Sequence, residues 1–254
     1  MRRGKAGNKG QHSINLAALP SVLAARSGRL GFNTKFLIEM GGETGLPGPT
    51  AICAFEREAL PADVLIASDG PRLSAARPTV FLGSRGAVDF DLSLNLRERA
   101  RHSGNGGGLL RNAAVVRAHA LASMVDAGGS ITAPELPPPP IQAAVRRALD
   151  GLEVGGPPGY RAVDEGWGEP GLSLVERVLG WNSFDILALK SGNPDKPVNT
   201  IPPTAMACCQ LRFIIGTDWE NIGAHLRRHR DRHGLENIAI NVDRGAPHHA
   251  ARPG

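Results

Sequence analysis

Two short apolar runs near the start of the chain each end in a turn that carries a carboxylate. Residues 36–38 lead into a glycine-rich turn that contains Glu43, and residues 64–66 lead into a turn that contains Asp69. Continuous apolar runs bounded by turns are typical of strands that are buried on both faces, as in parallel sheets. We therefore expect both acids to lie at the carboxyl edge of a parallel sheet, where α/β proteins hold their functional groups.

A helix is predicted before the first of these runs. Apolar residues follow helical spacing from Gln11 to Ala25, where Pro20 could introduce a kink. One helix beside two buried strands indicates a βαβ arrangement. The fold class predicted for residues 1–86 is therefore α/β, with part of a parallel sheet.

The pattern changes after Gly86 from continuous apolar runs to alternation. The stretch "AVDFDLSLNLRER" alternates apolar and polar residues with period two, as expected for a half-exposed antiparallel strand. A glycine-rich loop, "HSGNGGG", follows, and a proline-rich surface excursion is expected over residues 128–171. The remaining predicted elements are a helix at 109–125, strands at 184–189 and 205–215, a helix at 219–233 and a strand at 238–240.

The order β-α-β-β-α-β is that of the split βαβ, ferredoxin-like plan. We therefore predict three regions: a partial parallel-sheet domain over residues 1–86, an inserted ferredoxin-like domain over 87–240, and a tail or truncated return segment over 241–254. The tail contains almost no apolar periodicity.

Composition narrows the possible partners. The 254 residues carry a formal charge of +5, but the arginines are spread along the chain and few aromatic residues lie among them, so nucleic-acid binding is not expected. No apolar run approaches the roughly 18 residues of a membrane span. Three cysteines, Cys53, Cys208 and Cys209, form neither a disulfide framework nor a metal-binding spacing. These features predict a soluble, cytoplasmic protein with no membrane partner.

Several motifs in a fixed order resemble one enzyme family. They are "RRGKAGNKGQHS", "FLIEMGGETGLPG", "VLIASDGPR", "LGSRGAVDFDLSL", "RHSGNGGGL" and "NPDKPVNTIPP" followed by "CQLRFIIGTD". Together they resemble the co-catalytic zinc peptidases and amidohydrolases that include aminoacylase, carnosine dipeptidase and succinyl-diaminopimelate desuccinylase. The resemblance implies a zinc-bearing catalytic domain interrupted by a ferredoxin-like lid, and a homodimer formed through the lids.

The resemblance also implies roles for individual residues. Glu43 and Asp69 match ligands of the two zinc ions, and His102 matches the lid histidine that reaches the partner's active site to steady the substrate carbonyl. Asn199 and Arg212 match lid positions that hold polar groups of the substrate. Such a site uses zinc to lower the pKa of a bound water, which attacks a peptide-like substrate.

The chain departs from the family pattern at two positions. Gly42 stands where the family has the general base, and Gly7 stands where it has the aspartate that bridges the metals. The first histidine-and-aspartate motif is expected before Arg3, and the last histidine ligand beyond Gly254. The resemblance therefore predicts a hydrolase of peptide or N-acyl amide bonds that is catalytically impaired, with weak or absent zinc binding. The alternative is a non-catalytic dimerisation or regulatory module that pairs through the lid.

Simpler interpretations remain open for several residues. Glu43 and Asp69 could cap helices, because acids are favoured at helix N-termini. Arg212 could lie on a solvated strand face.

Three histidines recur every four residues, as in metal-binding helices: His225, His229 and His233. Neighbouring arginines disfavour a cation there, and we expect a solvated helix face. Adjacent strand residues point to opposite faces, so Cys208 and Cys209 are expected to be packing residues.

Overall fold

The computed structural model describes residues 10–38, 48–66, 84–154 and 163–243 of the chain. The chain divides into two compact units, Met1–Arg72 and Leu73–Gly254. Among the described residues, no helix is both long enough and apolar enough to cross a membrane.

The first unit contains the predicted helix but not the predicted strands. Helix α1 (Gly10–Ala25) runs through Pro20, and helix α2 (Gly48–Phe55) was not predicted. Residues 36–38 and 64–66 form no strand. Their side chains are solvent-exposed, with Leu65 at 90%. The prediction of two parallel strands is therefore wrong for the described part of this unit, where no neighbouring strand satisfies their backbone hydrogen bonds.

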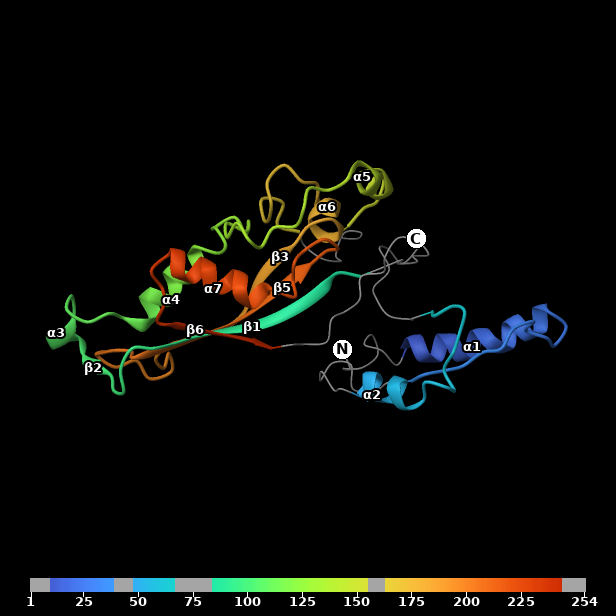
Figure 1. The fold of residues 1–254 in the computed structure, drawn as a ribbon, viewed down its shortest axis with the longest axis horizontal. Helices are drawn as coiled ribbons and strands as arrows, with labels where there is room; N and C mark the ends of the chain where they lie inside the picture. Colours follow the sequence, from blue (N-terminus) through green and yellow to red (C-terminus); the bar gives the residue numbers. More distant parts are fainter. Residues whose placement is uncertain (1–9, 39–47, 67–83, 155–162, 244–254) are drawn as a thin grey trace. The chain divides into compact units, whose positions relative to one another are not determined.

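The second unit contains all six elements predicted after Gly86 (Figure 1). The four strands form one antiparallel sheet in the order β3-β5-β1-β6. Helices α4 and α7 both pack on one face of it. The bounds are β1 (Gly86–Asn95), α4 (Ala113–Ala122), β3 (Ser183–Lys190), β5 (Thr204–Phe213), α7 (Ile222–Arg232) and β6 (Ile238–Asp243). Strand β6 thus continues beyond the predicted end at Ile240.

The pairing of β1 with β5 organises the core. All ten residues of β1 pair with β5 in an unbroken register, from Gly86 opposite Phe213 to Asn95 opposite Thr204. Alternate residues of both strands are buried beneath the helices. These buried side chains are Val88, Phe90, Leu92, Leu94, Ala205, Ala207, Cys209, Leu211 and Phe213. The opposite face of the sheet is open and mostly polar, as period-two alternation requires.

The two adjacent cysteines follow the same alternation. Cys209 is 1% exposed on the helix-covered face, whereas Cys208 lies half-buried on the open face. Burial raises the pKa of the Cys209 thiol to about 12. Neither is part of a disulfide, so the structure agrees with the expectation that they are packing residues.

A buried arginine fastens α4 to the central strand pair. The guanidinium of Arg117 is 1% exposed and donates to the backbone carbonyls of Leu92 on β1 and Ala205 on β5, the latter at 3.0 Å. Burial lowers the pKa of this guanidinium, because desolvation disfavours the charged form. One side chain of α4 thereby connects this helix to both central strands.

The excursion predicted over residues 128–171 is not wholly on the surface. Ala133 and Leu136 are 0% and 1% exposed and belong to the core. Buried Asn182 donates to the Leu136 carbonyl at 2.8 Å and accepts from the Ile214 amide at 3.0 Å. The segment also contains a short helix, α5 (Ala143–Leu149), and is followed by helix α6 (Leu174–Leu179). The expectation of a surface excursion was therefore wrong for its first part, because the apolar side chains of Ile131, Ala133 and Leu136 close the edge of the core.

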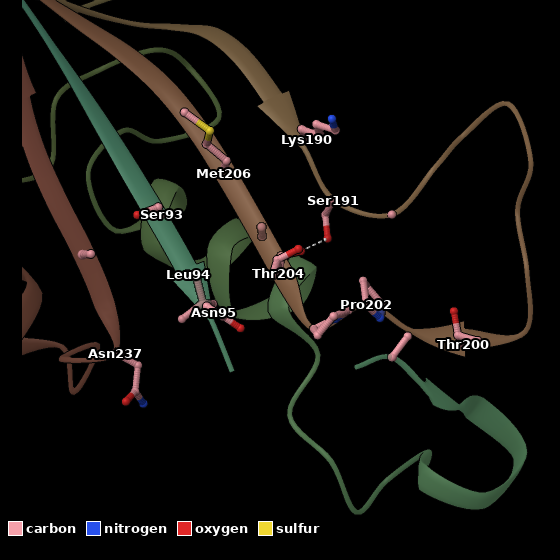
Figure 2. Close-up of a pocket in the computed structure, with 15 residues that line it drawn as sticks. Ser93, Leu94, Asn95, Lys190, Ser191, Thr200, Pro202, Thr204, Met206 and Asn237 are labelled. Atoms are coloured by element: carbon pink, nitrogen blue, oxygen red, sulfur yellow. Dashed lines mark hydrogen bonds between the residues drawn. The ribbon is translucent and has the colours of Figure 1, made fainter. Parts of the chain in front are cut away.

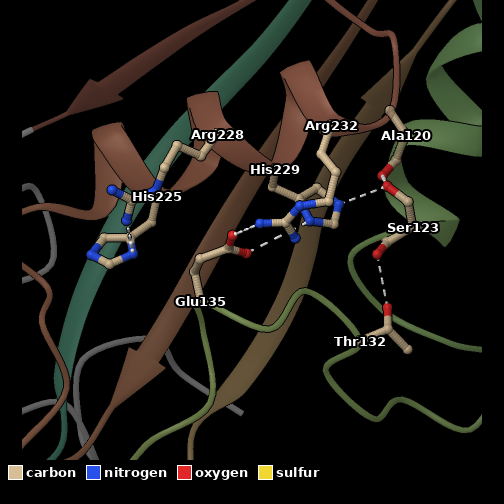
Figure 3. A network of polar contacts seen from close by, with 8 residues as sticks. All are labelled: Ala120, Ser123, Thr132, Glu135, His225, Arg228, His229 and Arg232. Atoms are coloured by element: carbon tan, nitrogen blue, oxygen red, sulfur yellow. Dashed lines mark hydrogen bonds and ion pairs between the residues drawn. The ribbon is translucent and has the colours of Figure 1, made fainter.

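The middle histidine of α7 is buried, contrary to the predicted solvated face (Figure 3). His229 is 1% exposed, and its Nε2 lies 2.9 Å from the hydroxyl of Ser123 at the end of α4. Its Nδ1 lies 3.9 Å from Oε2 of Glu135, whose other oxygen contacts Arg232. The helix presents this residue to the core because it lies three positions after the buried Leu226.

Protonation of His229 is disfavoured in the folded protein. Burial lowers its pKa first, and the nearby His233 and Arg232 lower it further, against the opposing effect of Glu135. The Ser123 hydroxyl donates to the Ala120 carbonyl at 2.8 Å, so Nε2–H of a neutral His229 donates to Ser123. Nδ1 of His229 and Oε2 of Glu135 then face each other without a hydrogen-bond partner among the described residues.

We predict that this histidine makes stability depend on pH. The folded pKa lies below the unfolded value of about 6.5, so the unfolded chain binds the proton first as pH falls. The free energy of unfolding should therefore decrease as pH falls below about 6.5. His229→Gln, which cannot titrate, should flatten this dependence in urea unfolding measured between about pH 7.5 and 5. The matched control is His119→Gln on the exposed side of α4, which should keep the wild-type slope. Equal slopes in all three proteins would contradict the assignment.

Candidate functional site

The structure brings His102 and Asn199 together on a small ribbon. Strand β2 (Arg101–His102) pairs with β4 (Thr200–Ile201), with His102 opposite Thr200. The amide of Ser103 donates to the Asn199 carbonyl at 2.9 Å. Two residues predicted from separate motifs are thus neighbours, although 97 positions separate them in the sequence (199 − 102).

The backbone fixes the state of the His102 ring. The ring precedes the short helix α3 (Ser103–Gly106), and its Nδ1 accepts from the Gly104 amide at 3.1 Å. Because Nδ1 accepts, a neutral His102 carries its hydrogen on Nε2. The side chain is exposed, so this N–H can donate to an incoming oxygen. That is the chemistry the resemblance implies for it.

The segment that contains Asn199 is anchored from three sides. Ile201 is buried, the Pro203 carbonyl accepts from the Leu96 amide at 2.9 Å, and the Pro202 carbonyl accepts from the Ala113 amide at 3.4 Å. These bonds connect the segment to the end of β1 and the start of α4. Asn199 is therefore held by backbone contacts on a rigid support, as a binding residue requires.

A groove lies beside this segment, at the end of the open face of the sheet (Figure 2). It has a volume of about 660 Å³. Its lining includes Thr200 and Pro202 from the anchored segment, Lys190 and Ser191 from the end of β3, and Asn95 from the end of β1. A cavity of this size could hold a small organic ligand. Sequence reasoning missed it, because the groove arises from the joint ends of several strands.

Arg212 lies at the opposite end of the sheet. Arg212 lies opposite Ala87 and Ser183 in the sheet. The ribbon instead adjoins the other end of β5, at Thr204. Eight residues of extended strand separate Thr204 from Arg212, or roughly 26 Å at about 3.3 Å per residue. Within one chain, the structure therefore does not bring Arg212 to His102 and Asn199.

Local contacts define the surroundings of Arg212. Its Nε donates to Oε1 of Gln210 at 2.7 Å, and Gln210 donates to Asp89 at 2.7 Å. The pKa of the nearby Arg85 is lowered, first by burial and then by the charge of Arg212. Two guanidinium groups close enough to repel each other would both be stabilised by an anion. Asp185 already acts on Arg85 as a nearby carboxylate, so the substrate role of Arg212 stays a prediction.

The predicted metal centre lies outside the part of the chain that the structure describes. Glu43, Asp69 and the substituted positions Gly42 and Gly7 all lie outside the described residues. Within the described ranges, no group of three or more histidine, cysteine or acidic side chains could hold a metal ion, the histidines of α7 included. The described residues therefore supply no zinc site, and the roles of Glu43 and Asp69 stay predictions.

We predict that the ribbon depends on close packing at Gly106. A Cβ at this buried position would lie 2.9 Å from Leu110 Cδ1 and 3.2 Å from Ile201 Cδ1. Gly106→Val should displace β4 and cost about 1–3 kcal/mol of stability through overpacking. Hydrogen exchange should then accelerate at the Ser103 amide, which reports the bond to Asn199. Gly166→Val, where added atoms meet open space, is the matched control. Unchanged Ser103 protection in Gly106→Val would show that the ribbon is held in another way.

Comparison with known proteins finds similar sequences among curated proteins and similar folds among solved structures. The Beta-Ala-His dipeptidase of Rattus norvegicus is 30% identical over 134 residues, which make up 52% of this chain and 27% of that protein. The Homo sapiens protein of the same name is also 30% identical over 134 residues, or 26% of its length. The matched region thus spans about a quarter of the curated relatives.

Solved structures extend the similarity over nearly the whole chain. The M20 family metallo-carboxypeptidase Sso-CP2 from Sulfolobus solfataricus has a TM-score of 0.74 at 22% identity, over 94% of this chain and 55% of that chain. Human carnosine dipeptidase 1 has a TM-score of 0.70 at 20% identity, over 98% of this chain and 55% of that chain. At these identities the likeness concerns the fold.

The family follows from the match to a whole domain. The family model described as "Peptidase dimerisation domain" matches residues 82–237, which is more than half of the chain. This range includes strands β1, β3 and β5 of the sheet, both packed helices and the ribbon with His102 and Asn199, and ends one residue before β6. The chain belongs to the M20 peptidase family, whose peptidase dimerisation domain it contains.

Proposed function

We propose that this chain is the lid-bearing part of a metal-dependent hydrolase that acts on peptide or N-acyl amide bonds. The observation that carries the proposal is that one anchored ribbon brings His102, opposite Thr200, next to Asn199, in a chain that belongs to the M20 family. The dipeptidases among its relatives support the substrate class. Assays of the chain and its variants, described below, test the proposal.

The second unit is proposed to be a ferredoxin-like lid. Its strands follow the order β3-β5-β1-β6, and a helix connects β1 with β3 and β5 with β6. The alternative connections of a parallel sheet would place adjacent strands in the same direction, whereas every pair in this sheet is antiparallel. Strand order and direction thus support the lid topology.

The proposed homodimer forms along the exposed edge of β3. Six of its eight residues are exposed. Ile186 and Leu189 lie on the helix-covered side of the sheet, opposite the buried Cys209 and Ala207, yet are 43% and 62% exposed. An exposed edge strand with apolar side chains is a template for pairing with another strand. A second copy of β3 would satisfy the backbone groups and cover both side chains.

Antiparallel pairing of two β3 strands would also bring the separated site residues closer. The second sheet would then run in the opposite direction, so that the His102 end of one copy lies beside the Arg212 end of the other. Three strand spacings separate the two β5 strands in that arrangement, or roughly 14 Å, against about 26 Å along β5 within one chain. This geometry supports the proposal that His102 acts on the partner's substrate.

Each of the three lid residues has a defined role in this proposal. The Nε2–H of His102 donates to the substrate carbonyl and stabilises the oxyanion that develops there. The guanidinium of Arg212 pairs with the substrate carboxylate, and Asn199 holds a polar group of the substrate. Zinc, held by Glu43 and Asp69 in this proposal, would supply a water of lowered pKa when bound.

We predict that the two copies associate through β3. Replacement of Ile186 and Leu189 by glutamate should convert a dimer to a monomer, because like charges would face each other across the edge. Sedimentation velocity over a range of protein concentrations measures this change. Leu65→Glu, at a side chain in the first unit that is 90% exposed, is the matched control and should remain dimeric. A wild-type monomer at all concentrations, or a double variant that stays dimeric, would refute this interface.

We further predict that the chain as given does not hydrolyse dipeptides or N-acyl amino acids at an enzyme-like rate. Gly42 replaces the expected general base, which contributes about 10² to 10⁴ in rate, and Gly7 replaces the bridging ligand. Gly42→Glu or Gly7→Asp alone should not restore activity, since base and ligands act as one unit. The assay compares wild type, each variant and the double variant with added zinc.

Two outcomes would change the proposal. Turnover by the unmodified chain that is abolished by Glu43→Ala would show that the site works despite both glycines. Normal dimerisation without zinc retention or turnover in any variant would instead favour the non-catalytic dimerisation module.

A further inference from the structure

The groove beside Asn199 is built from the last rows of the open sheet face. Lys190, Met206, Ser93 and Ala239 form one cross-strand row from β3 to β6, as the pairing registers give directly. Thr204 and Asn95 form the next row. Beyond them, the segment after β3 and the residues of β4 form the wall (Figure 2). The floor is therefore rigid sheet, and the wall is the anchored segment that carries the candidate site.

One side chain in the lining differs from all the others. Among the described residues that line the groove, Lys190 alone is ionisable and none is a carboxylate. The remaining polar groups are hydroxyls and amides, from Ser93, Asn95, Ser191, Thr200, Thr204 and Asn237. Neutral hydrogen-bonding groups around one cation match an anion of single charge. Met206 and two prolines add apolar surface for its body.

The charge of Lys190 is available. Within the described part of the chain, no acidic side chain lies within ion-pair distance of its ammonium group. The next acidic residue on the open face of β1 is Asp91, one row further from the groove. A hydrogen bond to that carboxylate raises the pKa of the Cys208 thiol, so Asp91 is engaged with its own neighbour. The sheet thus ends in a pocket with one unneutralised positive charge.

The rest of the lining can orient a bound carboxylate. The Ser191 hydroxyl donates to the Thr204 carbonyl at 2.8 Å, which fixes the segment after β3 against β5. The amide groups of Asn95 and Asn237 and the hydroxyl of Thr200 are exposed around the same space. Two carboxylate oxygens can accept from Lys190 and from these neutral donors together.

We propose that this groove binds a small carboxylate with a short apolar body, anchored by the ammonium group of Lys190. The carboxylate contacts Lys190 and the neutral donors, and the apolar body lies on Met206 and Pro202. This site is distinct from Arg212 at the far end of β5 and makes Lys190 the residue that selects a negative charge. The proposal goes beyond the hydrolase assignment and does not require catalysis.

The test uses two ligands of the same shape, hexanoate and hexanamide, which differ in charge. Neither contains a peptide bond, so the result does not depend on hydrolysis. Binding to the full chain is followed through the backbone amide resonances of Ser191, Gly192 and Thr200 during titration. Three variants complete the set: Lys190→Gln, the charge-preserving Lys190→Arg, and Lys196→Gln, which removes one charge from the same connecting segment but outside the groove lining.

Hexanoate should shift these resonances in the wild type and bind at least about tenfold more weakly to Lys190→Gln, as expected for loss of a charge-assisted hydrogen bond. Lys190→Arg and Lys196→Gln should keep wild-type affinity within about twofold, and hexanamide should bind weakly to every variant. An equal loss of hexanoate affinity in Lys196→Gln would show that binding depends only on net charge, and would overturn the proposal. Equal affinity for hexanamide, or shifts confined to other residues, would overturn it too. Failure of the hydrolase assays leaves these expectations unchanged.

Discussion

The ten-residue pairing of β1 with β5 is the constraint on which the second unit depends. Its unbroken register places every second side chain of both strands in the core and the others on the open face. A slip by one residue would bury Asp89 and Asp91 and expose Phe90 and Leu92, a cost that no neighbouring group could offset. The register therefore cannot shift, and it fixes which residues stand at each end of the sheet.

The buried polar groups of this unit attach irregular segments to that regular frame. Arg117 connects α4 to the carbonyls of β1 and β5, and Asn182 connects Leu136 in the long excursion to Ile214 after β5. His229 joins α7 to the end of α4 and lies opposite Glu135. The hydrogen bonds that these side chains form replace contacts with water that burial removes, so they specify where the segments lie. Strand pairing determines where the strands lie, and these few hydrogen bonds position the helices and connecting segments.

Sequence reasoning worked where a pattern repeats within one element. Period-two alternation predicted β1, since this pattern reports a buried face directly, and the helices predicted at 109–125 and 219–233 are observed as α4 and α7. It was wrong for residues 36–38 and 64–66, because an apolar run gives no information about whether a neighbouring strand is present. It was also wrong for His229, where charged neighbours suggested water. Adjacent arginines on a helix point to other faces, so they say little about the burial of the histidine between them.

The candidate site shows the same division between local pattern and assembly. Separate motifs identified His102 and Asn199, but their contact arises from the pairing of β2 with β4, which depends on where β1 and β5 end. The groove with Lys190 has no motif, because its lining comes from the ends of β1, β3 and β5 and the start of β6. Arg212, on the same strand that leads away from the ribbon, is held apart by the length of β5. In the proposed function, His102 and Arg212 at opposite ends of the sheet act on one substrate, and pairing with a second sheet of opposite direction would bring them together; the exposed apolar edge of β3 offers that pairing.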